Sequence, residues 1–387
     1  MRIFQVLSKR MSYGVSHDRG WLRNLYEPLI DLGHEVYLFE YSSFGKRSYF
    51  RGWDIEHGKL LEDEIVKQFD REQRKQPFDL FFSYLTDMEI TPGLPRHIES
   101  LGTPTANFSC NNTHQFHTVE NLSPHFTYSL HSEKDSARKF KAVGATPIWF
   151  PMAANPKYYQ PHRLEKEFDV TFVGQNYALR PYYIRHLLEN GIDVHAWGAG
   201  WKEKEELLFL RTLVNWGTKL RDALILTAIT NQEKRYYVAS RLAHHEFRDY
   251  LRDKYRDSLN WPLSDEETIK MFSRSKISVG FVEVWDFGQP GGLEKSHVHL
   301  REFEAPMSGA LYCTGYTDDL GEYYEPDKEV ITYRNRGELV DKIRFYLSHP
   351  IEAERIRKAG HERALKCHTC QERFDALFNE ILPGIDP

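Results

Sequence analysis

Residues 297–313 read HVHLREFEAPMSGALYC, and this stretch decides how the rest of the chain is interpreted. Its spacing predicts a short helix with two unlike faces, because polar and apolar residues each recur every three or four positions. The apolar stripe suits packing on a sheet. The polar positions are His297, Arg301, Glu304 and Ser308, and the apolar positions are Leu300, Phe303 and Met307.

The end of this helix and the start of a strand can both be predicted. Gly309 can end a helix, and residues 310–313 (ALYC) have the composition of a strand that follows it. Pro306 should limit or kink the helix, because proline cannot donate a backbone hydrogen bond.

The polar face has the chemistry of a site for phosphate and ribose. A helix N-terminus offers free amide donors and positive potential, and Arg301 adds a fixed cation, so the two together suit a diphosphate. Glu304, one turn later, is an acceptor that can take two hydrogen bonds from a ribose diol. The alternative is a surface ion pair between Arg301 and Glu304, which is common at this spacing and weakly stabilising. Spacing alone leaves both interpretations open.

This stretch resembles the C-terminal domain of group 1 glycosyltransferases, and most of all the branch called CgeB-like or spore-maturation-protein-like. The segments TDDL (317–320) and EPDKEV (325–330) extend the resemblance. It implies an α/β chain with the GT-B fold, in which two Rossmann-like domains face each other across a cleft that binds a nucleotide-sugar donor. It also implies that Glu304 holds the donor ribose. Many relatives carry another Glu that contacts the donor sugar, at the position where this chain has Ser296.

Length and composition fit two globular domains. The chain has 387 residues, a formal net charge of −5 and no apolar run near the roughly 20 residues that span a bilayer. The charge argues against general binding of nucleic acid by a basic surface. The four cysteines indicate no disulfide framework, and the lone CxxC at 367–370 is better explained by incidental thiols than by a metal site. We expect a cytoplasmic protein with no metal and no cofactor besides its nucleotide-sugar substrate.

Residues 1–155 alternate strand and helix signals, which predicts an N-terminal domain with a parallel sheet, and the resemblance implies that this domain is on the acceptor side. The loop after the first strand contains Gly14. The resemblance implies that Gly14 lets the backbone approach the sugar or diphosphate of the donor. A simple turn glycine is the alternative.

A polar segment at residues 109–117 follows another expected strand of this domain. Ligands bind beyond the carboxyl ends of strands in such sheets, so the acceptor is expected there. His114 and His117 are candidate general bases, because imidazole titrates in the useful range. Asp18, in the first loop, is a rival candidate. Histidines with a structural or surface role are the alternative.

The second domain is expected at 156–370, after a proline-rich hinge, and it opens with FDVTFVGQN (168–176). This pattern is a strand that runs into a glycine turn. The resemblance implies that Gly174, Gln175 and Arg180 meet the donor diphosphate. The physics agrees, because a small residue, a helix start and a cation coincide there.

A glycine-rich loop at 285–292 leads into the opening stretch. Gly291 and Gly292 are expected to lie over the donor, and a flexible linker is the alternative. Residues 203–260 have helical patterning and near-balanced charges, which predicts a helical insertion. Capping patterns at 132–135 (SEKD) and 264–267 (SDEE) predict two helix starts. Residues 371–387 are expected to form a C-terminal helix that returns toward the first domain.

The resulting hypothesis is a metal-independent glycosyltransferase, hexosyl or related, that uses a UDP-sugar as its most favoured donor. The acceptor is a glycan, a protein, a lipid-linked saccharide or a modified nucleobase. The alternatives are a nucleotide-sugar epimerase or hydrolase of the same fold, and a non-catalytic protein that binds a nucleotide-sugar. The sequence leaves the oligomeric state open, together with the choice between retention and inversion.

Overall fold

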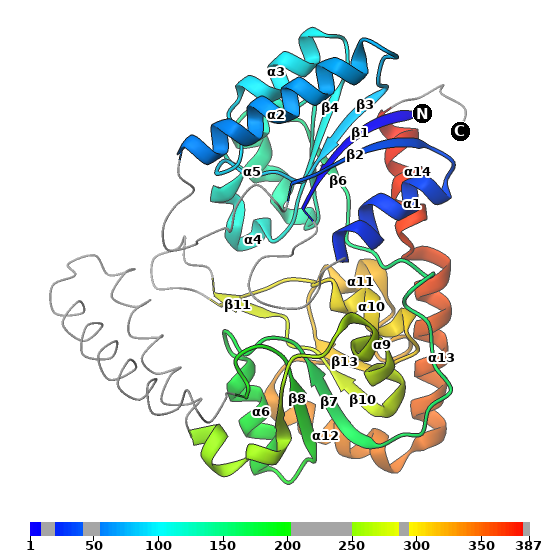
Figure 1. Cartoon of the computed structure of the whole chain (residues 1–387). Helices are drawn as coiled ribbons and strands as arrows, with labels where there is room; N and C mark the ends of the chain where they lie inside the picture. Colours follow the sequence, from blue (N-terminus) through cyan, green and yellow to red (C-terminus); the bar gives the residue numbers. More distant parts are fainter. Residues whose placement is uncertain (9–19, 42–54, 203–249, 286–293, 382–387) are drawn as a thin grey trace, which may run out of the picture. The chain divides into compact units, whose positions relative to one another are not determined.

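A computed structural model describes residues 1–8, 20–41, 55–202, 250–285 and 294–381. These residues divide into two compact units (Figure 1). The first unit contains the chain up to Tyr158 and again from Lys366 onward, and the second contains Tyr159–Leu365. Within the described ranges, no helix combines the length and the apolar character needed to cross a membrane.

The first unit is built on a parallel sheet of six strands in the order β2-β1-β3-β4-β5-β6. The apolar strand β1 is buried along its whole length, as expected for a central strand covered on both faces. The chain first moves from β1 to β2 and then continues on the other side of β1, so the strand order reverses between β1 and β3. The strands are β1 (Arg2–Leu7), β2 (Glu35–Glu40), β3 (Leu80–Ser83), β4 (Thr105–Ser109), β5 (Tyr128–His131) and β6 (Pro147–Trp149).

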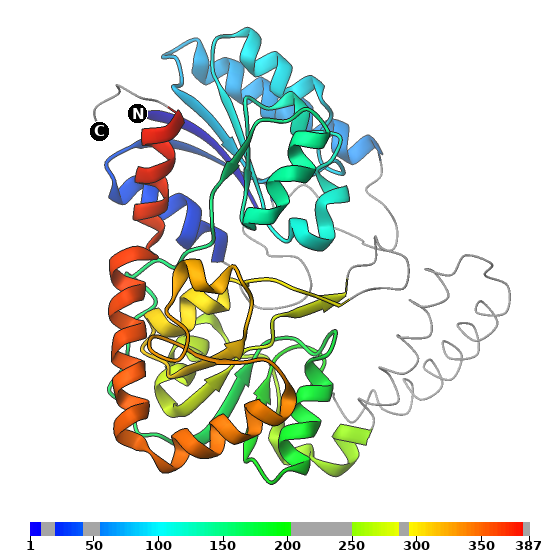
Figure 2. The ribbon, with the colours of Figure 1, turned by 180° about the vertical axis from the view of Figure 1, so that it is seen from behind.

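Helices cover both faces of this sheet. One face packs against α1 and α14 through a cluster that includes Leu25, Leu29 and Phe374, and the other packs against α2 and α3 through Ile65 and Leu94. Both views show this arrangement (Figures 1 and 2). The helices are η1 (Leu22–Tyr26), α1 (Glu27–Asp31), α2 (Ile55–Gln73), α3 (Gly93–Ser100), α4 (Asn112–Gln115), η3 (Phe116–Thr118), η4 (Ser123–His125), η5 (Lys134–Ser136), α5 (Ala137–Ala142) and α14 (Cys370–Ile381).

The second unit has its own six-stranded parallel sheet, in the order β14-β13-β10-β7-β8-β9. Its strand order reverses between β7 and β10. In open α/β sheets, ligands bind beyond the carboxyl ends of the strands at such a reversal. The strands are β7 (Phe168–Val173), β8 (Val194–Trp197), β9 (Leu259–Asn260), β10 (Ser275–Val279), β13 (Tyr312–Gly315) and β14 (Ile331–Tyr333), and β11 (Glu283–Trp285) and β12 (Glu294–Ser296) form a separate antiparallel pair.

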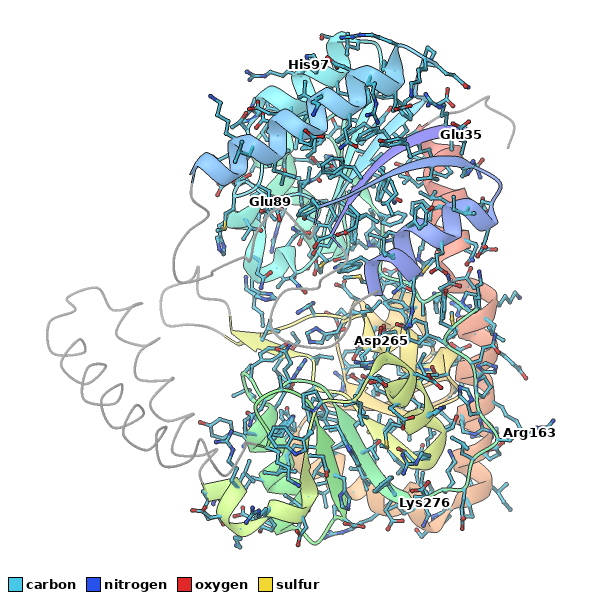
Figure 3. All side chains as sticks on the ribbon, in the orientation of Figure 1. Glu35, Glu89, His97, Arg163, Asp265 and Lys276 are labelled. Carbon is cyan, nitrogen blue, oxygen red and sulfur yellow. The ribbon has the colours of Figure 1, made fainter. Side chains whose placement is uncertain are left out.

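The two faces of the second sheet differ in composition. Val170 and Phe172 on β7 enter the apolar cluster with α6, α12 and α13, whereas Thr171 between them turns to the face of α9 and α10 and contacts Ser275 Oγ at 2.7 Å. The labelled Lys276 pairs with Asp169 near the amino ends of the strands (Figure 3). The helices are α6 (Arg180–Glu189), η6 (Arg256–Ser258), α9 (Asp265–Arg274), α10 (Arg301–Met307), α11 (Leu320–Tyr323), α12 (Arg336–Ser348) and α13 (Pro350–Cys367).

The predicted α/β class with two parallel, Rossmann-like halves is confirmed. The predicted cap at Ser264 is confirmed as well, because its side chain accepts a hydrogen bond from Glu267 N at 3.2 Å. The predicted helical insertion lies mostly outside the described residues. Of its described part, residues 250–254 are helical and η6 follows at Arg256–Ser258, as predicted, whereas the last two residues form β9, which pairs with β8 as the edge strand of the sheet.

Candidate functional site

Two glycine turns lie at the carboxyl edge of the second sheet, beside its strand reversal. Gly174 follows β7 and Gly198 follows β8, and a Cβ atom on Gly198 would lie 2.0 Å from Gly174 O. Hydrogen bonds join the two turns, since Gly174 N donates to Trp197 O at 2.8 Å and Trp201 Nε1 donates to Gly174 O at 2.7 Å. Glycine is therefore required for the two loops to meet at the carboxyl edge of the sheet.

Arg180 begins α6 directly after this turn, and stacking holds its side chain. Its guanidinium carbon lies 3.9 Å from the Tyr177 ring centroid and 5.5 Å from that of Phe172. One long hydrogen bond of 3.3 Å joins Nη1 to Gln175 O, while buried Nε has no partner. Among the described residues, no carboxylate pairs with this guanidinium. The group is thus oriented in advance and keeps most of its donors for a ligand.

The helix predicted to begin at His297 is shorter than expected. The helix α10 begins at Arg301, and His297 lies before it, buried, with its N–H donating to Val282 O at 3.2 Å. His297 therefore follows β12 in an extended segment rather than sharing a helix face with Arg301 and Glu304. The predicted helix end is confirmed, because Gly309 adopts a φ of +73° just after the last turn.

Several of the amide donors expected to be free at the start of this helix are bonded within the protein. The N–H of His299 donates to Glu302 Oε2 at 2.7 Å. The N–H groups of Glu302, Phe303 and Glu304 donate to the carbonyls of His299 and Leu300. These four amides are therefore not available to a ligand, and the side chains of the first turn are what we assign to a site.

Glu304 is buried and bound on both carboxylate oxygens. Only 6% of the residue is exposed. Its Oε1 accepts a hydrogen bond of 2.5 Å from the Tyr159 hydroxyl, and its Oε2 accepts one of 2.7 Å from Arg301 Nη1. Burial, followed by the charge of Glu304, raises the pKa of Tyr159 well above its usual value. The ion pair with Arg301 therefore exists, but it is not the solvated surface pair considered from spacing.

Glu302 is a buried carboxylate that the sequence did not reveal. It is 1% exposed, and its Oε1 accepts hydrogen bonds from the hydroxyls of Tyr312 and Thr314 at 3.1 and 2.9 Å. Burial raises the pKa of its carboxyl group. The available signal was the pair of hydroxyl residues two positions apart on β13, which point to the same face of the sheet.

The two arginines of the predicted site influence the same buried hydroxyl group, that of Tyr312. Burial and then the charge of Glu302 raise the pKa of Tyr312, and the guanidinium groups of Arg301 and Arg180 both oppose that rise. Arg180 begins the helix that follows β7, and Arg301 begins the helix that leads into β13, so both lie at the carboxyl edge of the second sheet, where Arg301 pairs with Glu304. Gly174 belongs to the same group, because its Cβ position lies 3.2 Å from Arg180 Nη1.

The predicted glycine loop, with Gly291 and Gly292, lies outside the described residues, as do Gly14 and Asp18 of the first loop. His114 is half-buried on α4, and His117 is exposed on η3. Both histidines therefore follow β4 at the carboxyl edge of the first sheet, as the strand pattern implied.

The structure adds Glu133 to this part of the first unit. Glu133 is 4% exposed, and its Oε2 accepts a hydrogen bond of 3.0 Å from Asn112 N at the start of α4. Burial raises the pKa of the carboxyl group to about 7, against the lowering effect of Asn112 N–H and Ser132. The helix start predicted at 132–135 is confirmed, because η5 begins at Lys134 and leads into α5, but no side chain caps it: Glu133 is buried and accepts from Asn112 N instead.

Among the described residues, no group of three or more His, Cys, Asp or Glu side chains is arranged to hold a metal ion. The cations at the second unit's site are the guanidinium groups of Arg180 and Arg301.

The comparison with protein families identifies the chain. The profile of the family described as "Glycosyl transferase-like" matches residues 180–379, which is more than half of the chain. The chain belongs to this family, and it is a glycosyltransferase. No curated protein matches the sequence.

Solved structures share the fold along the whole chain. Sucrose-phosphate synthase from Thermosynechococcus elongatus is 12% identical, with a TM-score of 0.60 and coverage of 98% of both chains. The Anabaena protein HepE, in complex with UDP and glucose, is 12% identical, with a TM-score of 0.58 and coverage of 99% and 100%. A glycosyltransferase involved in avilamycin A biosynthesis is 15% identical, with a TM-score of 0.57 and coverage of 99% and 98%. This chain therefore has the GT-B fold.

Proposed function

We propose that this glycosyltransferase binds a nucleoside-diphosphate sugar, with UDP as the favoured nucleotide, at the strand reversal of its second unit. The observation that carries the proposal is the guanidinium of Arg180, which is stacked, partly buried and without a carboxylate partner among the described residues. Such a group is suited to a diphosphate, which supplies planar pairs of acceptor oxygens. HepE, which shares the fold, was solved with UDP and glucose.

Each side chain of the site has a separate task in this proposal. Arg180 and Arg301 stabilise the negative charge that grows on the diphosphate as it leaves. Glu304 accepts hydrogen bonds from the ribose, in exchange for its contacts with Tyr159 and Arg301. Because two fixed cations serve the leaving group, the transfer needs no metal ion.

The reaction follows from these tasks. The bond between the sugar C1 and the diphosphate oxygen breaks, and its electron pair leaves with the diphosphate. An acceptor hydroxyl forms the new bond to C1 and gives up its proton. We assign the proton transfer to the first unit, with His114, His117 and Asp18 as the candidate bases. A hexosyl donor and membership of the CgeB-like branch complete the proposal, and they rest on the resemblance of residues 297–330.

The proposal is tested by titrating UDP, GDP and ADP into the full-length protein by calorimetry, in EDTA, with Arg180→Gln and Arg185→Gln as variants. Arg185 is the matched control, because it lies on the same helix and forms an exposed ion pair with Glu189. Charge-assisted hydrogen bonds contribute about 1.5–3 kcal/mol, so Arg180→Gln should weaken UDP binding by roughly 10- to 150-fold. The proposal fails if no diphosphate binds, or if the two variants bind alike.

A further inference from the structure

Glu283 occupies a structural position that neither the motif nor the family pattern indicates. It is the first residue of β11, and in the antiparallel pair of β11 and β12 it lies directly opposite Ser296. Residues that are directly opposite in such a pair place their side chains on the same face, with Cβ atoms about 5 Å apart. A carboxylate at Glu283 can therefore reach the space that a carboxylate at Ser296 would fill.

The chain places Glu283 next to the proposed diphosphate site. β10 ends at the strand reversal, and Glu283 follows it after three residues. The Tyr183 hydroxyl donates a hydrogen bond to Glu283 Oε1. Tyr183 lies one turn after Arg180 on α6, and residues at this spacing share a helix face. The Glu283 carboxylate is thus held by a residue one helical turn from Arg180, whose guanidinium has no carboxylate partner among the described residues.

Aromatic side chains fix the position of this carboxylate. The Tyr183 ring stacks on Phe281, with centroids 4.7 Å apart, and lies 5.8 Å from Tyr333. The guanidinium of Arg336 covers the same Tyr183 ring at 5.3 Å. Phe281 and Tyr333 belong to the core cluster of the sheet. Buried aromatic residues therefore fix the Tyr183 hydroxyl that holds Glu283, while Glu283 itself is only half-buried. This arrangement is expected of a residue that recognises a ligand.

We propose that Glu283 accepts hydrogen bonds from hydroxyl groups of the donor sugar, and that it replaces the carboxylate that related chains carry at the position of Ser296. The inference rests on the proposed function, because it assigns the sugar part of the same donor. A carboxylate has two oxygens and about four acceptor positions, so it matches a pair of neighbouring sugar hydroxyls. The position of a sugar's hydroxyl groups relative to the Glu283 carboxylate then decides how well the protein binds that donor.

The test uses three variants of the full-length protein: Glu283→Gln, Ser296→Glu, and the combination of Glu283→Ser with Ser296→Glu, which moves the carboxylate across the strand pair. Calorimetry measures the affinity for UDP and for UDP-glucose, and steady-state kinetics measures release of UDP from UDP-glucose. Glu283→Gln keeps an acceptor for the Tyr183 hydroxyl, so a merely structural role of Glu283 predicts little change.

We expect Glu283→Gln to leave the affinity for UDP within twofold, to lower the affinity for UDP-glucose and to reduce kcat/KM at least tenfold. The relocated carboxylate should recover at least a third of the loss. The inference is overturned if Glu283→Gln affects UDP and UDP-glucose equally or not at all, or if relocation recovers nothing in a protein with unchanged Tm. Failure of the unaltered protein to bind UDP would instead refute the proposed function itself.

Discussion

Glu133 gives a quantitative prediction about the first unit. Its pKa rises from an ordinary 4.5 to about 7, chiefly because the carboxyl group is buried. A shift of one pKa unit corresponds to about 1.4 kcal/mol, so ionisation of Glu133 costs the folded protein about 3 kcal/mol. The pKa of Glu133 is higher in the folded state than in the unfolded state. The contribution of the protonated carboxyl group to the free energy of unfolding is therefore fully present below pH 4.5 and is lost as the pH rises to about 7.

The variant Glu133→Gln removes this cost while keeping an oxygen that can accept the hydrogen bond from Asn112 N. Relative to the unaltered protein, the variant should therefore gain about 3 kcal/mol of unfolding free energy between pH 4.5 and pH 8. Urea unfolding followed by circular dichroism at several pH values measures this difference. The exposed Glu120, in the same part of the chain, provides the control Glu120→Gln. A difference between Glu133→Gln and the unaltered protein that does not change with pH would refute the reasoning.

Two further predictions concern the second unit. Gly198→Ala should lower the free energy of unfolding by at least about 3 kcal/mol, because φ is +147° and the new Cβ would meet Gly174 O. The control Gly321→Ala places its Cβ where no atom lies within 4 Å, so it should leave the Tm nearly unchanged. Tyr159→Phe should cost about 1.5–3 kcal/mol in urea unfolding, because it leaves the buried Glu304 carboxylate without one of its two donors. The effect of Tyr159→Phe should shrink in a Glu304→Gln background, and an unchanged effect would contradict the role given to this hydrogen bond.

Local patterns predicted the fold because each relevant signal is contained in a few neighbouring residues. The apolar run of β1, the cap at Ser264 and the glycine after α10 all gave the correct element. The failures at His297 and at β9 have one cause. Pairing with residues that are distant in sequence, Val282 and Ala196, overrides the local helical pattern.

The residues of the candidate site also fall into two groups, those with a local sequence signal and those without one. The placement of Arg180, Arg301 and Glu304 at helix starts could be predicted, because a glycine turn and a helix face indicate them locally, and their roles stay predictions. Glu133, Glu302 and Glu283 could not be, because what matters for each is a partner on another element: Asn112, Tyr312 and Tyr183. Single carboxylates carry no local signal of burial, and an ordinary capping or surface role fits the sequence equally well.

The most direct test of the central claim is a crystal structure of the protein with UDP. The distance to measure joins the guanidinium of Arg180 to the nearest diphosphate oxygen. We predict a hydrogen bond of about 2.7–3.2 Å, with the diphosphate beside Gly174 at the carboxyl end of β7. A UDP molecule bound away from this edge of the sheet, or an Arg180 side chain still stacked on Tyr177 without contact to phosphate, would contradict the account.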